Sequence, residues 1–240
     1  MSHSGKITNH INNRTRKAVS IIACAILVVI VVSVMVTRLL PSTELFDAND
    51  YVYSTEYSNE LSNIPVIQQE TSYTCGVVSM AIMKTHLGID TTEQGLLAEQ
   101  NLQGRQSGML PGEYLLYASK VFSPMSYEVT LLNPTSEAEI LNCITKSIEN
   151  NIPVIIFYAA EDAWNPPHFN THYGVIYGID VPRGIVKISN PYGYFEEVNF
   201  LELFDSLDFA SYPAKPLMFQ LGRMAGMIRP NNLFVFSKAE

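Results

Sequence analysis

The chain has 240 residues, with 15 basic and 23 acidic side chains, a net charge of −8 and 47% hydrophobic residues. This acidic balance argues against nucleic acid as a partner and weakly favours a cationic or neutral peptide. Three cysteines are too few for a disulfide scaffold, and the length after the first forty residues suits one globular core.

The first element is a segment without charged residues, 18–37 (AVSIIACAILVVIVVSVMVT). It is long enough to cross the ~30 Å core of a bilayer as a helix. Basic residues precede it and the first acidic residue, Glu44, follows it. The positive-inside rule therefore predicts a cytoplasmic tail over 1–17, a signal anchor in the cell membrane and an extracytoplasmic remainder.

Two alternatives for this segment are weaker. A cleaved signal peptide has a shorter apolar region and needs a small-x-small site, which Met35-Val36-Thr37 does not provide. A lipoprotein cleavage box before Cys24 would leave most of the apolar residues after the cysteine rather than before it. Residues 38–62 are polar and acidic, and we expect an irregular extracytoplasmic spacer there.

The domain predicted over 63–240 begins with helices. An apolar run predicts a helix over Val77–Leu87, and capping boxes at Asp90–Glu93 and Ser136–Glu139 predict two more, the first ending at about Gln100. A further helix is expected from Pro111 to Lys120. Apolar runs then predict strands, and the later ones form antiparallel pairs: Tyr127–Leu132, Pro153–Tyr158, the run from His172, Ile185–Ser189 and Leu233–Ser237.

Helices first and strands later indicate an α+β fold of two lobes, a helical lobe and an antiparallel sheet, with the site between them. Near the end of the chain, Phe200–Phe204 has the pattern of a short amphipathic helix. The apolar segment Phe219–Ile228 leaves three possibilities open: packing on the sheet, binding a partner or touching the membrane.

One stretch has the composition of a thiol active site, Gln69 to Gly76 (QETSYTCG). Cys75 lies at the predicted start of a helix, where free N–H groups and the helix dipole favour a thiolate. Gln69, six residues earlier, can donate its side-chain amide to the oxyanion of a tetrahedral intermediate. Cys75 is thus the candidate nucleophile, with an expected pKa below that of a free thiol.

The matching base is His172, at the start of the run HYGVIYGI. A turn at Val181–Gly184 pairs this run with the strand that ends at Asn190. Asn190 should then lie beside His172, hold one ring nitrogen and direct the other toward the sulfur.

The pattern Q-x5-C-G, H-Y-x-V-x-x-G and N-P resembles the bacteriocin-processing, double-glycine leader peptidases within the papain-like cysteine peptidases, over about residues 64–198. This resemblance implies Cys75 as nucleophile, His172 as general base and acid, Asn190 as orienting residue and Gln69 as oxyanion donor. Two features depart from the family. Many relatives have Asp in place of Asn190, and nothing in this chain resembles the Walker motif of the export ATPase to which the leader peptidases are fused.

Three alternative functions are compatible with these sequence features. The first is a membrane-anchored extracytoplasmic cysteine peptidase acting on peptides or proteins through a thioester acyl-enzyme. The second uses the same triad for acyl transfer or cell-wall amide hydrolysis, and the third is a non-catalytic binding module. We expect no cofactor and no metal, because Pro166 and Pro167 exclude the helix that a His168–His172 metal pair would need.

Overall fold

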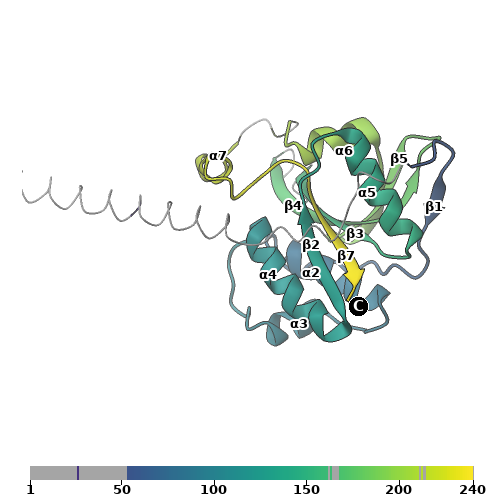
Figure 1. The fold of residues 1–240 in the computed structure, drawn as a ribbon. Coiled ribbons are helices and arrows are strands. Elements are labelled where there is room, and N and C mark those ends of the chain that lie inside the picture. Colours follow the sequence, from purple (N-terminus) through teal and green to yellow (C-terminus); the bar gives the residue numbers. More distant parts are fainter. Residues whose placement is uncertain are drawn as a thin grey trace, which may run out of the picture.

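The computed structural model describes residues 26, 53–161, 163, 168–210, 212 and 215–239. Its centre is a seven-stranded antiparallel sheet with helices on both faces (Figure 1). The strands pair in the order β2-β7-β3-β4-β5-β6, and β1 adds to β4. The strands are β1 Ser58–Glu60, β2 Tyr127–Leu132, β3 Val154–Glu161, β4 Phe169–Asp180, β5 Ile185–Asn190, β6 Tyr194–Asn199 and β7 Asn232–Lys238. The expected combination of helices with an antiparallel sheet is confirmed.

The helices divide between the two faces of the sheet. They are α2 Cys75–His86, α3 Glu93–Glu99, α4 Pro111–Phe122, α5 Glu137–Glu149, α6 Phe200–Leu207 and α7 Leu217–Met224, with a 3-10 turn at Ser123–Met125. On one face lie α2, α3 and α4 of the predicted helical lobe, on which α7 packs through Phe219, and on the other face lie α5 and α6 (Figure 1).

Helix α2 is the centre of the first lobe. Its residues from Cys75 to Lys84 are all buried, so the helix is enclosed around its whole circumference, as expected of a helix inside a core. Tyr114 of α4 stacks on Tyr173 of β4, with ring centroids 4.4 Å apart, and joins the helices to the sheet. This packing fixes the start of α2 against β4.

The opposite face of the sheet is covered by α5 and α6. The predicted N-cap of α5 is confirmed, because the Ser136 hydroxyl accepts a hydrogen bond from the Glu139 N–H at 3.2 Å. The Glu139 carboxylate reaches back to the Thr135 N–H at 2.6 Å, one residue earlier than a standard capping box requires. Cys143 is buried on this helix, away from the lobe that contains Cys75.

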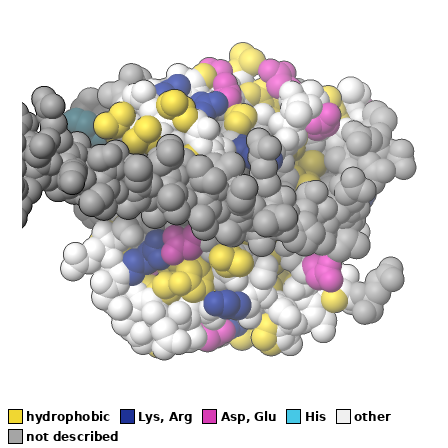
Figure 2. All heavy atoms as spheres, turned by 60° about the vertical axis from the view of Figure 1, so that its left-hand side comes forward, with side chains coloured by type: hydrophobic (Ala, Val, Ile, Leu, Met, Phe, Trp, Pro, Cys, Tyr) yellow, Lys and Arg dark blue, Asp and Glu magenta, His cyan; other side chains and the backbone are white. Residues whose placement is uncertain are grey.

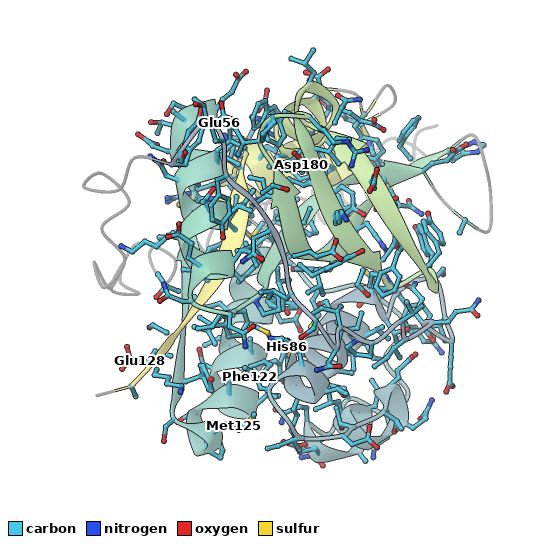
Figure 3. All side chains as sticks on the ribbon, turned by 90° about the vertical axis from the view of Figure 1, so that its right-hand side faces the viewer. Glu56, His86, Phe122, Met125, Glu128 and Asp180 are labelled. Carbon is cyan, nitrogen blue, oxygen red and sulfur yellow. The ribbon has the colours of Figure 1, made fainter. Side chains whose placement is uncertain are left out.

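Two parts of the sheet were not predicted. The expectation of irregular chain up to Ser62 is wrong for Ser58–Glu60, because these residues pair with Gly178–Asp180 and the next residue, Leu61, is buried. Figure 3 shows Glu56 and Asp180 at the same end of the molecule, where β1 joins β4. Strand β6 was also missed, since its sequence YFEEVN has charges on both faces and no clean alternation.

The segment near the C-terminus is divided between core and surface. Phe219 and Ile228 are buried in the core between the first lobe and the sheet. Of the three possibilities for Phe219–Ile228, packing on the sheet therefore holds for these two residues. Along α7, by contrast, Leu217, Leu221 and Met224 are exposed. Figure 2, with the side of α7 turned forward, shows hydrophobic side chains next to Lys and Arg side chains on the upper part of this surface.

The predicted membrane segment 18–37 lies outside the described residues, apart from Ile26. Within the part of the chain that the structure describes, no helix has the length and hydropathy needed to span a bilayer.

Candidate active site

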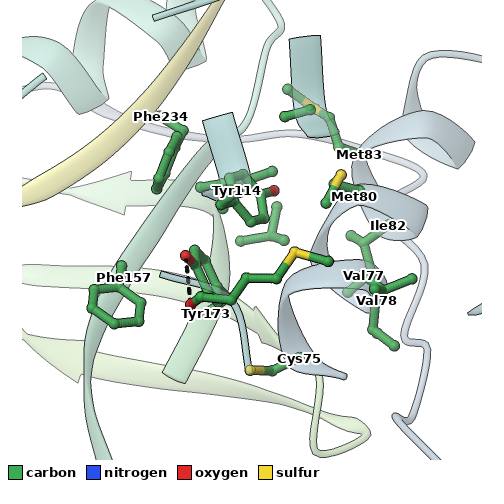
Figure 4. Packing of buried hydrophobic residues seen from close by; sticks show 14 of the residues in the cluster. Cys75, Val77, Val78, Met80, Ile82, Met83, Tyr114, Phe157, Tyr173 and Phe234 are labelled. Atoms are coloured by element: carbon green, nitrogen blue, oxygen red, sulfur yellow. Dashed lines mark hydrogen bonds between the residues drawn. The ribbon is translucent and has the colours of Figure 1, made fainter. Parts of the chain in front are cut away.

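Cys75 is the first residue of α2, as the sequence predicted. The N-cap residue, Thr74, makes no side-chain hydrogen bond to the helix, so its hydroxyl does not occupy the N–H groups of the first turn. Figure 4 shows Cys75 at this end of α2, at the margin of the cluster that contains Tyr114, Tyr173 and Phe157. The helix therefore presents its positive end at the thiol.

The expected lowering of the Cys75 pKa is not what the structure gives. Burial raises the pKa of this thiol from its ordinary value of 9.0 to about 11, because only 5% of the residue is exposed. The backbone N–H groups of Tyr173, Gly76 and Cys75 oppose this by hydrogen bonding to the sulfur. These dipoles do not outweigh burial, so activation of the thiol requires a neighbouring cation.

His172 and Asn190 are in direct contact. His172 Nε2 lies 2.9 Å from Asn190 Oδ1, and both residues are about 1% exposed. An amide oxygen can only accept, so Nε2 carries the hydrogen and Nδ1 is the basic nitrogen of the ring. This is the contact predicted from the pairing of β4 with β5.

A turn after β5 completes the support of the imidazole. The Tyr192 N–H donates to Asn190 Oδ1 at 2.9 Å, and the Tyr192 ring stacks on His172 with centroids 4.1 Å apart. Gly193 follows with a φ of +96°, which favours glycine. The ring of His172 is thereby held both along its edge and across its face.

Gln69 is 2% exposed and its Nε2 donates to the Thr71 carbonyl at 2.6 Å. That bond uses one of the two amide hydrogens and leaves a second donor. The same amide's Oε1 is buried without a hydrogen-bond partner. Turning the amide over would place oxygen against the Thr71 carbonyl, so the orientation is fixed by this contact.

Short backbone contacts bring the four residues together. The Gln69 N–H donates to the carbonyl of Pro191 at 2.7 Å, which places Gln69 against the residue that follows Asn190. The thiol of Cys75 lies near the backbone of Tyr173, the residue after His172, whose N–H lowers the pKa of the thiol. The segments that carry residues 69, 75, 172 and 190, which are distant in sequence, therefore lie together where the start of α2 approaches β4 and the end of β5.

The loop that carries Gln69 is anchored by a buried carboxyl group. Glu93, in the first turn of α3, accepts from the Glu70 N–H at 2.8 Å. Burial raises the pKa of Glu93, against the effect of hydrogen bonds from Thr74 and Glu70. This contact connects α3 to the segment between Gln69 and Cys75.

Sequence reasoning missed the residues that surround His172 and Asn190. Tyr192 and Gly193 belong to an Asn-Pro-Tyr-Gly turn, and the Asx-type bond within it is a recognisable signal. Glu196 and Tyr158 contact Asn190 from β6 and β3, and no local pattern indicates that. Their position follows from strand register, which the sequence did not give for β6.

Other candidate chemistry is not supported in the described part of the chain. Cys75 and Cys143 are both free thiols, so no disulfide blocks the candidate nucleophile. Among the described residues, no group of three or more His, Cys, Asp or Glu side chains is arranged to hold a metal ion.

Comparison with known proteins gives a family match. The model of the Peptidase_C39 like family matches residues 61–204, which include the four site residues. No curated protein matches the chain.

The solved structures that are similar to the chain include the following three. The first, described as a C39-like peptidase from Bacillus anthracis, has 18% identity and a TM-score of 0.48, and covers 77% of this chain and 99% of its own. A double-glycine motif protease from an AMS/PCAT transporter, in complex with the leader peptide, has 14% identity and a TM-score of 0.45. The match covers 75% of this chain and 96% of that protease. The peptidase domain of Streptococcus ComA has 12% identity and a TM-score of 0.41, with 74% and 100% covered.

Proposed function

Because the chain belongs to the Peptidase_C39 like family and is a cysteine peptidase, we propose that it hydrolyses peptide bonds with Cys75, His172, Asn190 and Gln69. The observation that carries this assignment is the pair of contacts on neighbouring residues of β4. His172 is hydrogen-bonded to Asn190, and the next residue, Tyr173, packs against the start of α2, where its backbone N–H lowers the pKa of Cys75. These two contacts support the assignment of His172 as the base for Cys75.

The reaction follows from these positions. His172 Nδ1 takes the thiol proton as the sulfur attacks the peptide carbonyl carbon, and the carbonyl oxygen becomes negative. The free N–H of the Gln69 amide donates to that oxygen, while the imidazolium stays hydrogen-bonded to Asn190. His172 then gives its proton to the leaving amine, and a thioester joins Cys75 to the acyl group. Water, deprotonated by His172, releases the acid and restores the thiol.

The substrate is a peptide or protein, and the test does not require its identity in advance. The full-length protein is incubated with a mixture of peptides in ¹⁸O-labelled water, with and without an added amine. Hydrolysis places ¹⁸O in new C-termini, and this product is absent with Cys75→Ser and present with Cys143→Ser. Amine adducts without ¹⁸O would establish acyl transfer instead. The absence of any Cys75-dependent product would contradict the proposal.

We also propose that the catalytic domain lies outside the cytoplasm, anchored by residues 18–37. The support is the length of this apolar segment and the basic residues before it. Membrane fractionation and protease treatment of intact cells test the location. The proposal predicts a membrane-bound protein whose domain is degraded from outside. Recovery in the soluble fraction, or protection from the protease, would contradict it.

A further inference from the structure

The amide of Asn190 is hydrogen-bonded on both sides. Its Oδ1 accepts from His172 Nε2 and from the Tyr192 N–H, each at 2.9 Å. Its Nδ2 donates to Glu196 Oε1, also at 2.9 Å, and lies 3.3 Å from the Tyr158 hydroxyl. A carboxylate on β6 therefore stands directly behind the residue that holds the imidazole.

We propose that Glu196 is a positioning residue of this site, which orients Asn190 and supplies the negative charge that favours the His172 imidazolium. The inference rests on the proposed function, because it assigns His172 as the base. It also accounts for a departure noted in the sequence. An aspartate in place of Asn190 would put a charge directly on the imidazole, whereas here the charge stands one side chain further away.

The orientation of Asn190 follows from hydrogen-bond chemistry. An ionised carboxylate only accepts, so Glu196 selects the amide orientation in which Nδ2 faces β6. If the amide were reversed, its oxygen would face the carboxylate and its NH₂ group would face the Tyr192 N–H. Both contacts would be repulsive. Oδ1 is thereby held toward His172, which fixes the ring tautomer with Nδ1 as the base.

The charge on Glu196 is supported by its donors. The pKa of Glu196 is raised overall, chiefly by burial and also by the charge of Glu202, while hydrogen bonds from Asn190 and Tyr158 oppose this rise because they stabilise the ionised form. Tyr158 donates to the same oxygen, Oε1, at 3.2 Å. A cavity of about 300 Å³ also lies beside Asn190 and Glu196, with room for water to solvate the carboxylate.

Other ionisable groups surround this line of contacts and are unchanged in the variants below. They come from α2, β3, the β5–β6 turn, β6 and α6, and are Cys75, Tyr158, Glu161, Tyr192, Tyr194 and Glu202. The matched control is Glu197→Gln, one residue along β6. Glu197 is exposed and pairs with Arg183, so this change removes the same charge without touching Asn190.

The test uses the full-length protein and needs no substrate. The pKa of His172 is measured by NMR with ¹³C-labelled histidine, and the rate of Cys75 alkylation by iodoacetamide is measured at pH 7. Glu196→Gln keeps an oxygen for the Asn190 amide but loses the charge. We expect the His172 pKa to fall by about one unit, from Coulomb's law at an intermediate dielectric, and alkylation to slow about tenfold. Glu197→Gln should change neither.

A second variant separates charge from structure. In Glu196→Gln combined with Asn190→Asp, the charge returns next to the imidazole, and the His172 pKa and alkylation rate should recover to at least the wild-type values. Cys143 serves as the internal check of folding, since it stays unreactive while α5 is packed. A wild-type His172 pKa in Glu196→Gln, or failure of the double variant to recover, would overturn the inference. Slow alkylation of wild-type Cys75 would instead refute the proposed function itself.

Discussion

At the scale of single residues, two effects act in opposite directions on the ionisation of Cys75. Burial at the start of α2 keeps Cys75 protonated, whereas a nucleophile must lose its proton. The helix terminus and three backbone N–H groups favour the thiolate without overcoming burial. The remaining contribution has to come from His172, whose proton-accepting nitrogen is set by Asn190. Catalysis therefore depends on a base that is itself fixed by hydrogen bonds.

Gln69 gives a prediction about the oxyanion. Gln69→Ala removes the second amide donor and should lower kcat for the peptide identified in labelled water by roughly 10²- to 10³-fold. The rate of Cys75 alkylation should not change, because the thiol keeps its base and its N–H donors. Gln103→Ala, in an exposed loop, is the control and should behave as the wild type. An unchanged kcat in Gln69→Ala would remove this residue from the mechanism.

The buried thiols also predict a pH dependence of stability. Burial raises the pKa of Cys143 from 9.0 to about 12, so the folded thiol stays protonated at a pH where the unfolded one ionises. The unfolded state then binds fewer protons, and stability falls as the pH rises above 9. Between pH 9 and 10 this loss is about 1 kcal/mol for one thiol.

Urea denaturation of the wild type and of Cys143→Ala at the two pH values measures this difference. The variant should lose about 1 kcal/mol less free energy of unfolding than the wild type over that interval. Tyrosines with raised pKa values, such as Tyr114, contribute equally to both proteins and cancel. Equal losses would show that the Cys143 thiol ionises in the folded state.

At the scale of elements, the turn between β5 and β6 positions the site. Gly193 has a φ of +96°, and a Cβ placed there would lie 2.9 Å from the Cβ of Gln68, the neighbour of Gln69. Gly193→Ala therefore forces this turn against the oxyanion segment. Gly88 is a matched control, with a φ of +93° and no atom within 4 Å of such a Cβ.

Both alanine variants should lose about 1 to 2 kcal/mol of stability from the left-handed backbone. Only Gly193→Ala should also lose activity, by at least tenfold in kcat, because only there is Gln69 displaced. Thermal unfolding and peptide turnover of the two variants make the comparison. Equal activities would show that the turn does not hold the oxyanion segment.

The sequence predicted the elements that local chemistry determines. The strand Tyr127–Leu132 and the starts of α2, α4 and α5 followed from apolar runs and helix-capping residues, and the contact of His172 with Asn190 followed from a hairpin. Strands β1 and β6 were missed because a three-residue strand and a charged edge strand have no local pattern. The pKa of Cys75 was predicted in the wrong direction, since burial depends on tertiary packing.

At the scale of the whole molecule, the sheet joins the two ends of the described domain. Strand β7 comes last in the chain but lies between β2 and β3 in the sheet (Figure 1). Its Leu233 and Val235 enter one core and its Phe234 and Phe236 enter the other. The hydrophobic cores on both faces of the sheet therefore depend on a strand near the C-terminus.

Removal of residues 232–240 should abolish cooperative unfolding, because four buried apolar side chains and the pairing of β7 with β2 and β3 are lost together. Removal of only residues 239–240 is the control and should leave a cooperative transition. Circular dichroism during thermal unfolding distinguishes the two. A cooperative transition in the longer deletion would show that the two cores are stable without β7.

The central claim, that His172 activates Cys75, is tested most directly by the pH dependence of iodoacetamide alkylation in the full-length protein, with Cys143 as the internal reference. We predict that wild-type Cys75 reacts at neutral pH, well ahead of Cys143. In His172→Ala, the pKa of Cys75 should rise toward the value of about 11 that burial sets. Slow reaction of wild-type Cys75, rising only in alkali together with Cys143, would contradict the account.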